Sequence, residues 1–188
     1  GGRDQDFNSY TLNRAFQSHR QPGSSIKPLI VYTPAFERGY DPNTIVDDHK
    51  FEGGPSNATN TYAGKIPLRY AVAKSLNTVA WQVYEQVTPK VGLQYLKNMN
   101  FSSIVKDDYT LATSLGGFTK GVSPLEMASA YAALENDGMF RQPNCIKSIV
   151  DADENVVYSS QMAEVSIYEK DATRTMTDFF KVNSPFIK

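Results

Sequence analysis

The chain has 188 residues, of which 40% are hydrophobic and 12% are aromatic. At about 100 to 200 residues per domain, this length accommodates one domain or a large part of one and excludes a second full domain. The apolar content excludes a disordered or collagen-like chain, and the formal net charge of -1 excludes a globally basic surface that would attract nucleic acid.

Cysteine and histidine are too scarce to suggest a disulfide or metal site. Cys145 is the only cysteine, so no intramolecular disulfide can form, and we expect a small packed residue rather than a catalytic thiol. His19 and His49 are far apart, which disfavours a metal centre and favours chemistry without a cofactor. No apolar run reaches the roughly 18 residues of a membrane span, and residues 1–10 lack a signal-peptide pattern, so they indicate a domain boundary.

The first two thirds of the chain are predicted to be mostly helical. Apolar spacing after the turn at 21–23 predicts a helix from Ser24 to about Arg38, kinked at Pro34. Residues 41–64 carry turn signals and little periodicity, which predicts a long surface excursion that either binds a ligand or connects two elements. Helical segments follow at 67–72, 79–84 and 89–99, and a polar loop is expected at 106–108.

The last third begins with the strongest local signal. Ser123-Pro124-Leu125-Glu126 is a capping box with proline at the first helical position, and Asp137-Gly138 supplies the stop. We expect the apolar face of this helix to contain Leu125, Ala128 and Ala132. Residues 145–150 and 156–158 flank a polar loop and predict a hairpin, the only strands that the pattern indicates. A final helix is predicted from about Glu169 to Lys181, with an apolar stripe of Ala172, Met176, Phe179 and Phe180.

Ser24 and Lys27 form a Ser-x-x-Lys pair at the start of the first predicted helix. Residues three apart lie on one helical face, so the lysine amine can reach the serine hydroxyl. A serine hydroxyl is a poor nucleophile at neutral pH, and a lysine whose charged form is disfavoured can take its proton. The helix start adds free backbone N–H groups for an oxyanion. The alternative is that Ser24 only caps a helix and Lys27 is solvated, because this short pattern is common by chance.

Ser75-Leu76-Asn77 lies at a break between two predicted helices, about 50 residues further along. A hydroxyl there could relay a proton, and a carboxamide could orient a substrate amide. Serine and asparagine are also ordinary residues at helix breaks, so this triplet by itself is weak evidence of function.

Longer runs around these residues resemble a known family. RQPGSSIKPL, RYAVAKSLNTVA and LATSLGGFTKGVSPLEMASAYAALENDG resemble the transpeptidase domain of class A (bifunctional) penicillin-binding proteins, particularly of the Gram-positive type, from Gly1 to about Lys181. The opening GGRDQDFN resembles the end of the strand before the serine helix. The resemblance implies a mixed α/β, penicillin-binding protein/β-lactamase-like serine transpeptidase fold, of which this chain would supply mostly helices and one hairpin.

The resemblance also implies roles for individual residues. Ser24 would be the acylated nucleophile, Lys27 its proton acceptor, Ser75 a relay to the leaving amine and Asn77 a hydrogen-bonding group for the substrate peptide. The implied reaction attacks the penultimate D-alanine carbonyl of a peptidoglycan stem peptide, releases D-alanine and transfers the acyl group to a neighbouring amine, without metal or cofactor. A β-lactam antibiotic would mimic the first step.

One element of the family pattern is absent, since the chain contains neither Lys-Thr-Gly nor Lys-Ser-Gly. Thr119-Lys120-Gly121 has the wrong order and is interpreted as structural. We therefore expect residues 1–188 to be a partial transpeptidase domain, completed by a second segment of the same protein that carries the Lys-Thr-Gly strand. Without that segment the apolar stripe with Met176, Phe179 and Phe180 is expected to be exposed and the chain poorly stable.

The predicted function is D,D-transpeptidase activity in cell-wall biogenesis, at the outer face of the cytoplasmic membrane, with the anchor and a glycosyltransferase domain on a segment not present here. The alternatives are a D,D-carboxypeptidase or β-lactamase-like hydrolase, in which water replaces the amine, and a non-catalytic β-lactam sensor. Because the resemblance is bacterial, the glycosylation patterns Asn57-Ala58-Thr59 and Asn100-Phe101-Ser102 are set aside.

Overall fold

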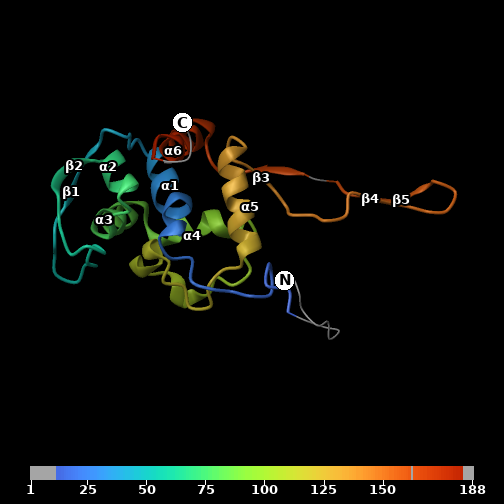
Figure 1. The fold of residues 1–188 in the computed structure, drawn as a ribbon, viewed down its shortest axis with the longest axis horizontal. Helices are drawn as coiled ribbons and strands as arrows, with labels where there is room; N and C mark the ends of the chain where they lie inside the picture. The colour runs from blue at the N-terminus through green and yellow to red at the C-terminus, as the bar shows by residue number, and fades with distance from the viewer. Residues whose placement is uncertain (1–11, 162, 184–188) are drawn as a thin grey trace.

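The computed structural model describes residues 12–161 and 163–183. Its α-helices are α1 (Thr33–Phe36), α2 (Leu68–Ala73), α3 (Asn77–Val87), α4 (Pro89–Asn98), α5 (Pro124–Glu135) and α6 (Lys170–Asn183). The strands are β1 (Ile45–Asp48), β2 (Gly64–Pro67), β3 (Met139–Arg141), β4 (Ser148–Val150), β5 (Val156–Ser159) and β6 (Glu164–Ser166). The helices form one body, and the β4–β5 hairpin extends away from it (Figure 1).

The predicted serine helix is a continuous helical path with three geometries. It runs through a 3-10 helix, η1 (Gly23–Ile26), a π-helix, η2 (Pro28–Tyr32), and α1. In the π-helical turn the backbone N–H of Thr33 donates to the carbonyl of Pro28, five residues earlier. Proline has no N–H to donate to a helical hydrogen bond. The π-helical turn lies between two prolines, Pro28 and Pro34, just before the position of the predicted kink.

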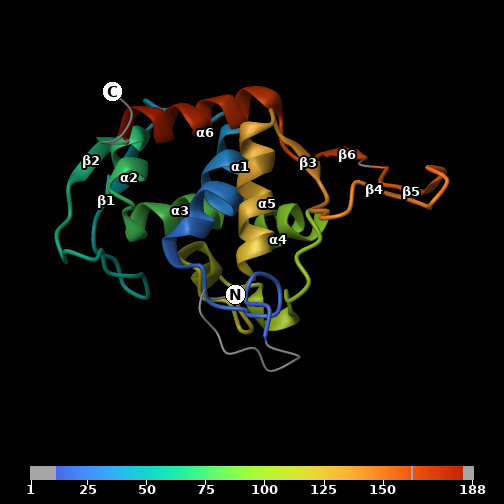
Figure 2. The same cartoon turned by 45° about the vertical axis from the view of Figure 1, so that its right-hand side comes forward.

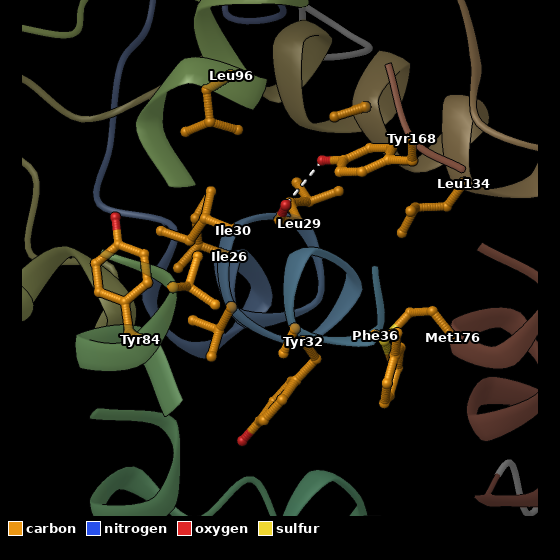
Figure 3. Close-up of a cluster of buried hydrophobic side chains, with 14 of the residues drawn as sticks. Ile26, Leu29, Ile30, Tyr32, Phe36, Tyr84, Leu96, Leu134, Tyr168 and Met176 are labelled. Carbon is orange, nitrogen blue, oxygen red and sulfur yellow. Dashed lines mark hydrogen bonds between the residues drawn. The ribbon is translucent and has the colours of Figure 1, made fainter. Parts of the chain in front are cut away.

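This helical path forms the centre of the core. Every residue from Ile26 to Phe36 is at most 9% exposed, and in Figure 2 α1 lies between α3 and α5 with α6 across its end. The hydroxyl of Tyr168 donates to the carbonyl of Leu29 at 2.8 Å (Figure 3), and the Phe179 ring stacks on Phe36 with centroids 5.8 Å apart. Hydrophobic side chains therefore surround the serine helix on several sides, and the core fixes its position.

Helix α6 confirms most of the predicted apolar stripe but not its exposure. Ala172, Met176 and Phe179 are 5%, 0% and 8% exposed, whereas Phe180 is 39% exposed. The expectation that Met176 and Phe179 would be exposed in this chain is wrong, because both pack against the other helices and belong to the hydrophobic core.

Helix α5 confirms the capping box but not the predicted face. Ser123 accepts a hydrogen bond from the N–H of Glu126 at 3.2 Å, and Glu126 accepts one from the N–H of Ser123 at 2.7 Å. Leu125, Ala128 and Ala132 all lie on the exposed side. The helix is apolar around most of its circumference, so periodicity did not distinguish this face from the buried one, which contains Ala130, Ala133 and Leu134.

The described residues contain more strands than the two of the predicted hairpin. β4 and β5 pair as expected, but β1 pairs with β2 and β3 pairs with β6, so the described residues hold three two-stranded antiparallel sheets. Both additional pairs combine strands of three or four residues across long connections, which leaves no hairpin signal in the sequence. The 41–64 excursion therefore includes a strand, β1. Cys145, expected to be packed, is exposed before the hairpin.

The remaining helices begin close to the predicted positions, with α2, α3 and α4 separated by short breaks. The expected polar loop near 106 contains a 3-10 turn, and within it Asp108 is buried. The N–H and the hydroxyl of Thr119 both donate to Asp108 at 2.7 Å, which supports the structural interpretation of Thr119-Lys120-Gly121.

Across the described parts of the chain, no helix combines the length and hydrophobicity needed to cross a membrane.

Candidate active site

Lys27 is the centre of the site and is 1% exposed, the opposite of the solvated side chain considered as an alternative. Its ammonium donates to the carbonyl of Ser75 at 2.7 Å, to the hydroxyl of Ser75 at 3.1 Å and to the carboxamide oxygen of Asn77 at 2.8 Å. These three bonds use all three ammonium protons. Burial disfavours the charged form and lowers the pKa of Lys27 to about 8, so the neutral amine is accessible near neutral pH.

Ser24 lies in η1, three residues before Lys27, and is exposed. Both side chains line a cavity of about 390 Å³ together with Ser75. The neighbouring serine is engaged elsewhere, because the Ser25 hydroxyl donates to the carbonyl of Pro22 at 2.7 Å. Both adjacent serines line this cavity, and they differ in that the Ser25 hydroxyl proton is already donated to Pro22.

A glycine contact supports the start of the serine helix. Gly116 has a φ of +86°, and a Cβ at that position would lie 2.3 Å from the backbone nitrogen of Gly23. Only a residue without a side chain allows this approach. Gly116 belongs to the SLGG portion of the third quoted run, so that run is in direct contact with the Ser-x-x-Lys turn.

Ser75 occupies a backbone conformation that is unusual for serine. Its φ is +53°, in the left-handed region that favours glycine. The Ser75 N–H donates to Val72 O and the Leu76 N–H donates to Ala71 O, which is the Schellman pattern that ends a helix. Glycine would fit this turn with less strain but would lack the hydroxyl that contacts Lys27. Such strain at a non-glycine residue is concentrated at functional sites.

Asn77 begins α3 and is half-buried. Its carboxamide oxygen accepts from Lys27, and its amide nitrogen donates to the carbonyl of Ser56 at 2.9 Å. The structure thus brings the predicted residues Lys27, Ser75 and Asn77 into direct contact and places Ser24 at the same cavity. Asn77 contacts the lysine directly, a contact that the sequence analysis did not anticipate.

The sequence analysis missed a buried polar network beside the site. Asp48, Asn57 and Thr78 are 1%, 3% and 0% exposed, and the carboxamide oxygen of Asn57 accepts from the N–H of Asn77 at 2.8 Å. Asn57 had been considered only as a glycosylation acceptor, and its burial agrees with setting that aside. No local sequence signal joins these residues, because they are 9 to 30 positions apart.

Among residues 12–161 and 163–183, no group of three or more His, Cys, Asp and Glu side chains could hold a metal ion. The residues gathered at the cavity supply serine hydroxyls and an amine, and the carboxamide of Asn77 bonds to that amine. A hydroxyl beside an amine of lowered pKa is an arrangement suited to acyl transfer through serine.

Comparisons with known proteins agree with this arrangement. The family model of the penicillin binding protein transpeptidase domain matches residues 2–185. Penicillin-binding protein 4 of Bacillus subtilis (strain 168) is 33% identical over 192 residues, covering 100% of this chain and 30% of that protein. Penicillin-binding protein 1A/1B of the same organism is 36% identical over 155 residues, covering 79% of this chain and 17% of that protein. The chain thus spans less than a third of the length of these relatives.

Solved structures show the same fold at lower sequence identity. The PonA1 protein from Mycobacterium tuberculosis, in complex with penicillin V, superposes with a TM-score of 0.80 at 21% identity, covering 93% of this chain and 50% of that chain. Penicillin-Binding Protein 1A from Haemophilus influenzae gives a TM-score of 0.77 at 22% identity, covering 92% of this chain and 31% of that chain. The fold is the mixed α/β fold expected from the sequence, and the chain belongs to the penicillin-binding protein transpeptidase domain family.

Proposed function

We propose that this chain carries the acylating half of a serine D,D-transpeptidase that cross-links peptidoglycan stem peptides and is inhibited by β-lactams. The observation that carries the proposal is the buried Lys27, which bonds to Ser75 and Asn77 and shares a cavity with Ser24. Among the described residues Lys27 bonds to neutral oxygens and forms no ion pair with a carboxylate. A buried lysine of this kind, with a lowered pKa, is suited to accept a proton.

In the first step, the neutral amine of Lys27 takes the proton of the Ser24 hydroxyl, and the serine oxygen attacks the penultimate D-alanine carbonyl. With a pKa of about 8, about a tenth of the lysine amines are neutral at pH 7. The tetrahedral intermediate collapses when the bond to terminal D-alanine breaks, and the leaving nitrogen takes a proton from Lys27 through the Ser75 hydroxyl, 3.1 Å away. This leaves an acyl ester on Ser24.

In the second step, an amine from a neighbouring strand attacks the ester, loses its proton to the same relay and regenerates the Ser24 hydroxyl. Asn77, which is bonded to Lys27, is proposed to move its carboxamide between Lys27 and the substrate peptide. One solved relative is described as an imipenem acyl-enzyme complex of penicillin-binding protein A from M. tuberculosis, which supports acylation of this chain by β-lactams.

The proposal includes a second segment of the same protein that carries a Lys-Thr-Gly strand and completes the substrate-carboxylate and oxyanion contacts. Its support is the absence of that triplet from the 188 residues and the separate two-stranded sheets of the described residues. Removing one of two oxyanion donors costs about 10² to 10³ in rate. Residues 1–188 alone should therefore react with a fluorescent penicillin that much more slowly than the full-length natural protein. Equal rates, with equally cooperative melting, would contradict this part of the proposal.

An extracellular location is proposed from the family for this chain, and a membrane anchor and a glycosyltransferase domain are proposed for parts of the protein outside it. They are supported by the class A names of relatives such as penicillin-binding protein 1A from Pseudomonas aeruginosa, 33% identical over 173 residues. Protease accessibility of residues 1–188 on intact cells tests the location. Protection of the chain until the membrane is disrupted would contradict it.

One experiment separates the proposed transpeptidase from its rivals. The full-length natural protein is incubated with a D-Ala-D-Ala stem peptide, with and without an amine acceptor, and both released D-alanine and amide product are measured. A transpeptidase forms the amide in proportion to the amine. A carboxypeptidase or β-lactamase-like hydrolase releases D-alanine or opens the β-lactam without using the amine, and a sensor acylates with a penicillin but turns over no peptide.

A further inference from the structure

We propose that Asn57, held by the buried carboxylate of Asp48, is a positioning residue that fixes Asn77 against the Lys27 amine. This inference rests on the proposed function and extends it to residues outside the catalytic set. Asn57 lies in the connection between β1 and β2, and β1 lies alongside α3 (Figure 1), so two distant segments meet at the site.

The first step is the acceptor side of Asn57. Its carboxamide oxygen accepts from the backbone N–H of Asn77 at 2.8 Å and of Thr78 at 3.3 Å. The first N–H groups of a helix have no partner within the helix, and the N-cap residue of α3, Leu76, offers no side-chain acceptor. Asn57 therefore caps α3 from a segment 20 residues earlier and fixes the backbone of Asn77.

The second step is the donor side. The Asn57 amide nitrogen donates to Asp48 Oδ1 at 2.7 Å and to the carbonyl of Thr61 at 3.0 Å. Asp48 also accepts from the hydroxyl of Thr78 and from the N–H of Ala63. Burial by itself raises the pKa of Asp48, but the hydrogen bonds from Thr78, Asn57 and Ala63, together with the electrostatic effect of His49, outweigh it and leave the pKa lowered. The carboxylate is thus ionised and accepts only.

The charge of Asp48 fixes the direction of the Asn57 carboxamide. In the reversed orientation the amide oxygen would face the carboxylate and the NH₂ group would face two N–H donors, so every bond would be lost. With the nitrogen held toward Asp48, the oxygen must face Asn77. A buried carboxylate, which can only accept hydrogen bonds, is well suited to fix which end of the Asn57 amide faces Asn77.

The third step connects the pair to the lysine. The side chain of Asn77 is held at its nitrogen by the carbonyl of Ser56, next to Asn57, and its oxygen accepts from Lys27 at 2.8 Å. Residues 56 and 57 therefore hold both the backbone and the side chain of Asn77. Releasing Asn57 would free the carboxamide oxygen that stabilises the Lys27 ammonium, without changing any group that contacts Lys27 directly.

The test is the Asn57→Ala variant of the full-length natural protein, with two separate readouts. The titration of the Lys27 amine is followed by NMR with isotope-labelled lysine, and the rate of acylation by a fluorescent penicillin is measured. Loss of an acceptor disfavours the charged amine, so its titration midpoint should fall below the wild-type value. A misplacement of about 1 Å can cost about 10²-fold in rate, and we expect a loss of that order.

Asp108→Ala is the matched control for lost stability. Asp108 is also 1% exposed and accepts three hydrogen bonds, but its donors, Val105 and Thr119, lie outside the site. This variant should be destabilised to a similar extent and still titrate Lys27 and acylate like wild type. If Asn57→Ala does not fold at the assay temperature, Asp48→Asn keeps the side-chain volume, removes the orienting charge and should shift both readouts in the same direction by less.

The outcomes separate the two proposals. An unchanged Lys27 midpoint and an acylation rate within about threefold of wild type in a folded Asn57→Ala variant overturn the positioning role. Equal losses in Asp108→Ala also overturn it, because they would show an effect of stability alone. A shifted midpoint in a protein that no penicillin acylates would support the positioning role and overturn the proposed function.

Discussion

Lys27 and Asp48 are each 1% exposed, yet one is close to losing its charge and the other remains ionised. Lys27 faces a cavity and donates to three neutral oxygens on residues 75 and 77, and burial lowers its pKa to about 8. Asp48 borders a different cavity, of about 340 Å³, and burial raises the pKa of its carboxyl, but the hydrogen bonds from Thr78, Asn57 and Ala63 and the electrostatic effect of His49 outweigh burial and leave the pKa lowered. The comparison shows that burial alone does not decide whether a buried side chain keeps its charge. Lys27 can exchange a proton near neutral pH, whereas Asp48 keeps its charge and orients the groups that donate to it.

The largest expected effect is on the acylation rate, when Lys27 is replaced by a residue that keeps its charge permanently, as Asp48 keeps its own near neutral pH. In Lys27→Arg the guanidinium stays protonated and cannot accept the Ser24 proton. Acylation of the full-length natural protein by a fluorescent penicillin should fall by about 10² to 10⁴. Lys74→Arg is the matched control, since Lys74 is exposed and close to Ser75 along the chain. A folded Lys27→Arg protein that acylates within tenfold of wild type would exclude the general-base role.

On the Asp48 side, the expected loss is in stability. Asp48→Ala leaves the donors of Asn57, Thr78 and Ala63 buried without this acceptor. Unsatisfied buried groups cost about 1 to 3 kcal/mol each in unfavourable cases, and we expect the free energy of unfolding to fall by about 3 kcal/mol in total. Urea denaturation measures it. A change below about 0.5 kcal/mol, the size typical of surface substitutions, would mean that the network is not structural.

The resemblance assigns roles to Ser24, Lys27, Ser75 and Asn77, because each pair is close in sequence and part of a recognisable run, and these roles remain predictions. The sequence could not locate Asn57 or Asp48, because their contacts join positions far apart and depend on the β1–β2 pairing, whose short strands carry little pattern. The buried face of α5 was predicted wrongly for a different reason, because an alanine-rich helix has no strongly apolar side. Short motifs can therefore be recognised in a sequence, whereas the residues that hold them in place depend on tertiary contacts.

The pH dependence of the acylation rate tests the contrast between Lys27 and Asp48, with a smaller expected effect. With the Lys27 pKa at about 8, the neutral amine increases about tenfold between pH 7 and pH 9, and the acylation rate should rise with it. The lowered pKa also means that the unfolded chain binds more protons than the folded chain between about pH 8 and the ordinary lysine value of 10.5, so stability should rise with pH in that window.

Asp48 should change stability in the same direction with pH, but in the acid range. Its lowered pKa contributes stability above the ordinary aspartate value of 3.8, and this contribution is lost as pH falls through the folded-state value. Acid denaturation of wild type and Asp48→Asn should therefore differ in steepness below pH 4. An acylation profile that is flat from pH 7 to pH 9 would contradict the role of Lys27 and leave that of Asp48 intact.

The smallest expected effect concerns the strained residue between the two regions. Ser75→Gly relieves a left-handed conformation at φ +53°, and relief of this strain is worth about 1 kcal/mol. The variant should therefore be about 1 kcal/mol more stable in urea denaturation while losing the proposed relay and acylating more slowly. A less stable Ser75→Gly protein would show that the hydroxyl contact with Lys27 outweighs the strain.

The most direct test of the central claim is the site of covalent attachment. The full-length natural protein is treated with a penicillin, digested and mapped by mass spectrometry, alongside the Lys27→Arg variant. The account predicts a single adduct on Ser24 in wild type and almost none in the variant under the same exposure. An adduct on Ser25, Ser75 or Ser123, or an undiminished Ser24 adduct in the variant, would contradict it.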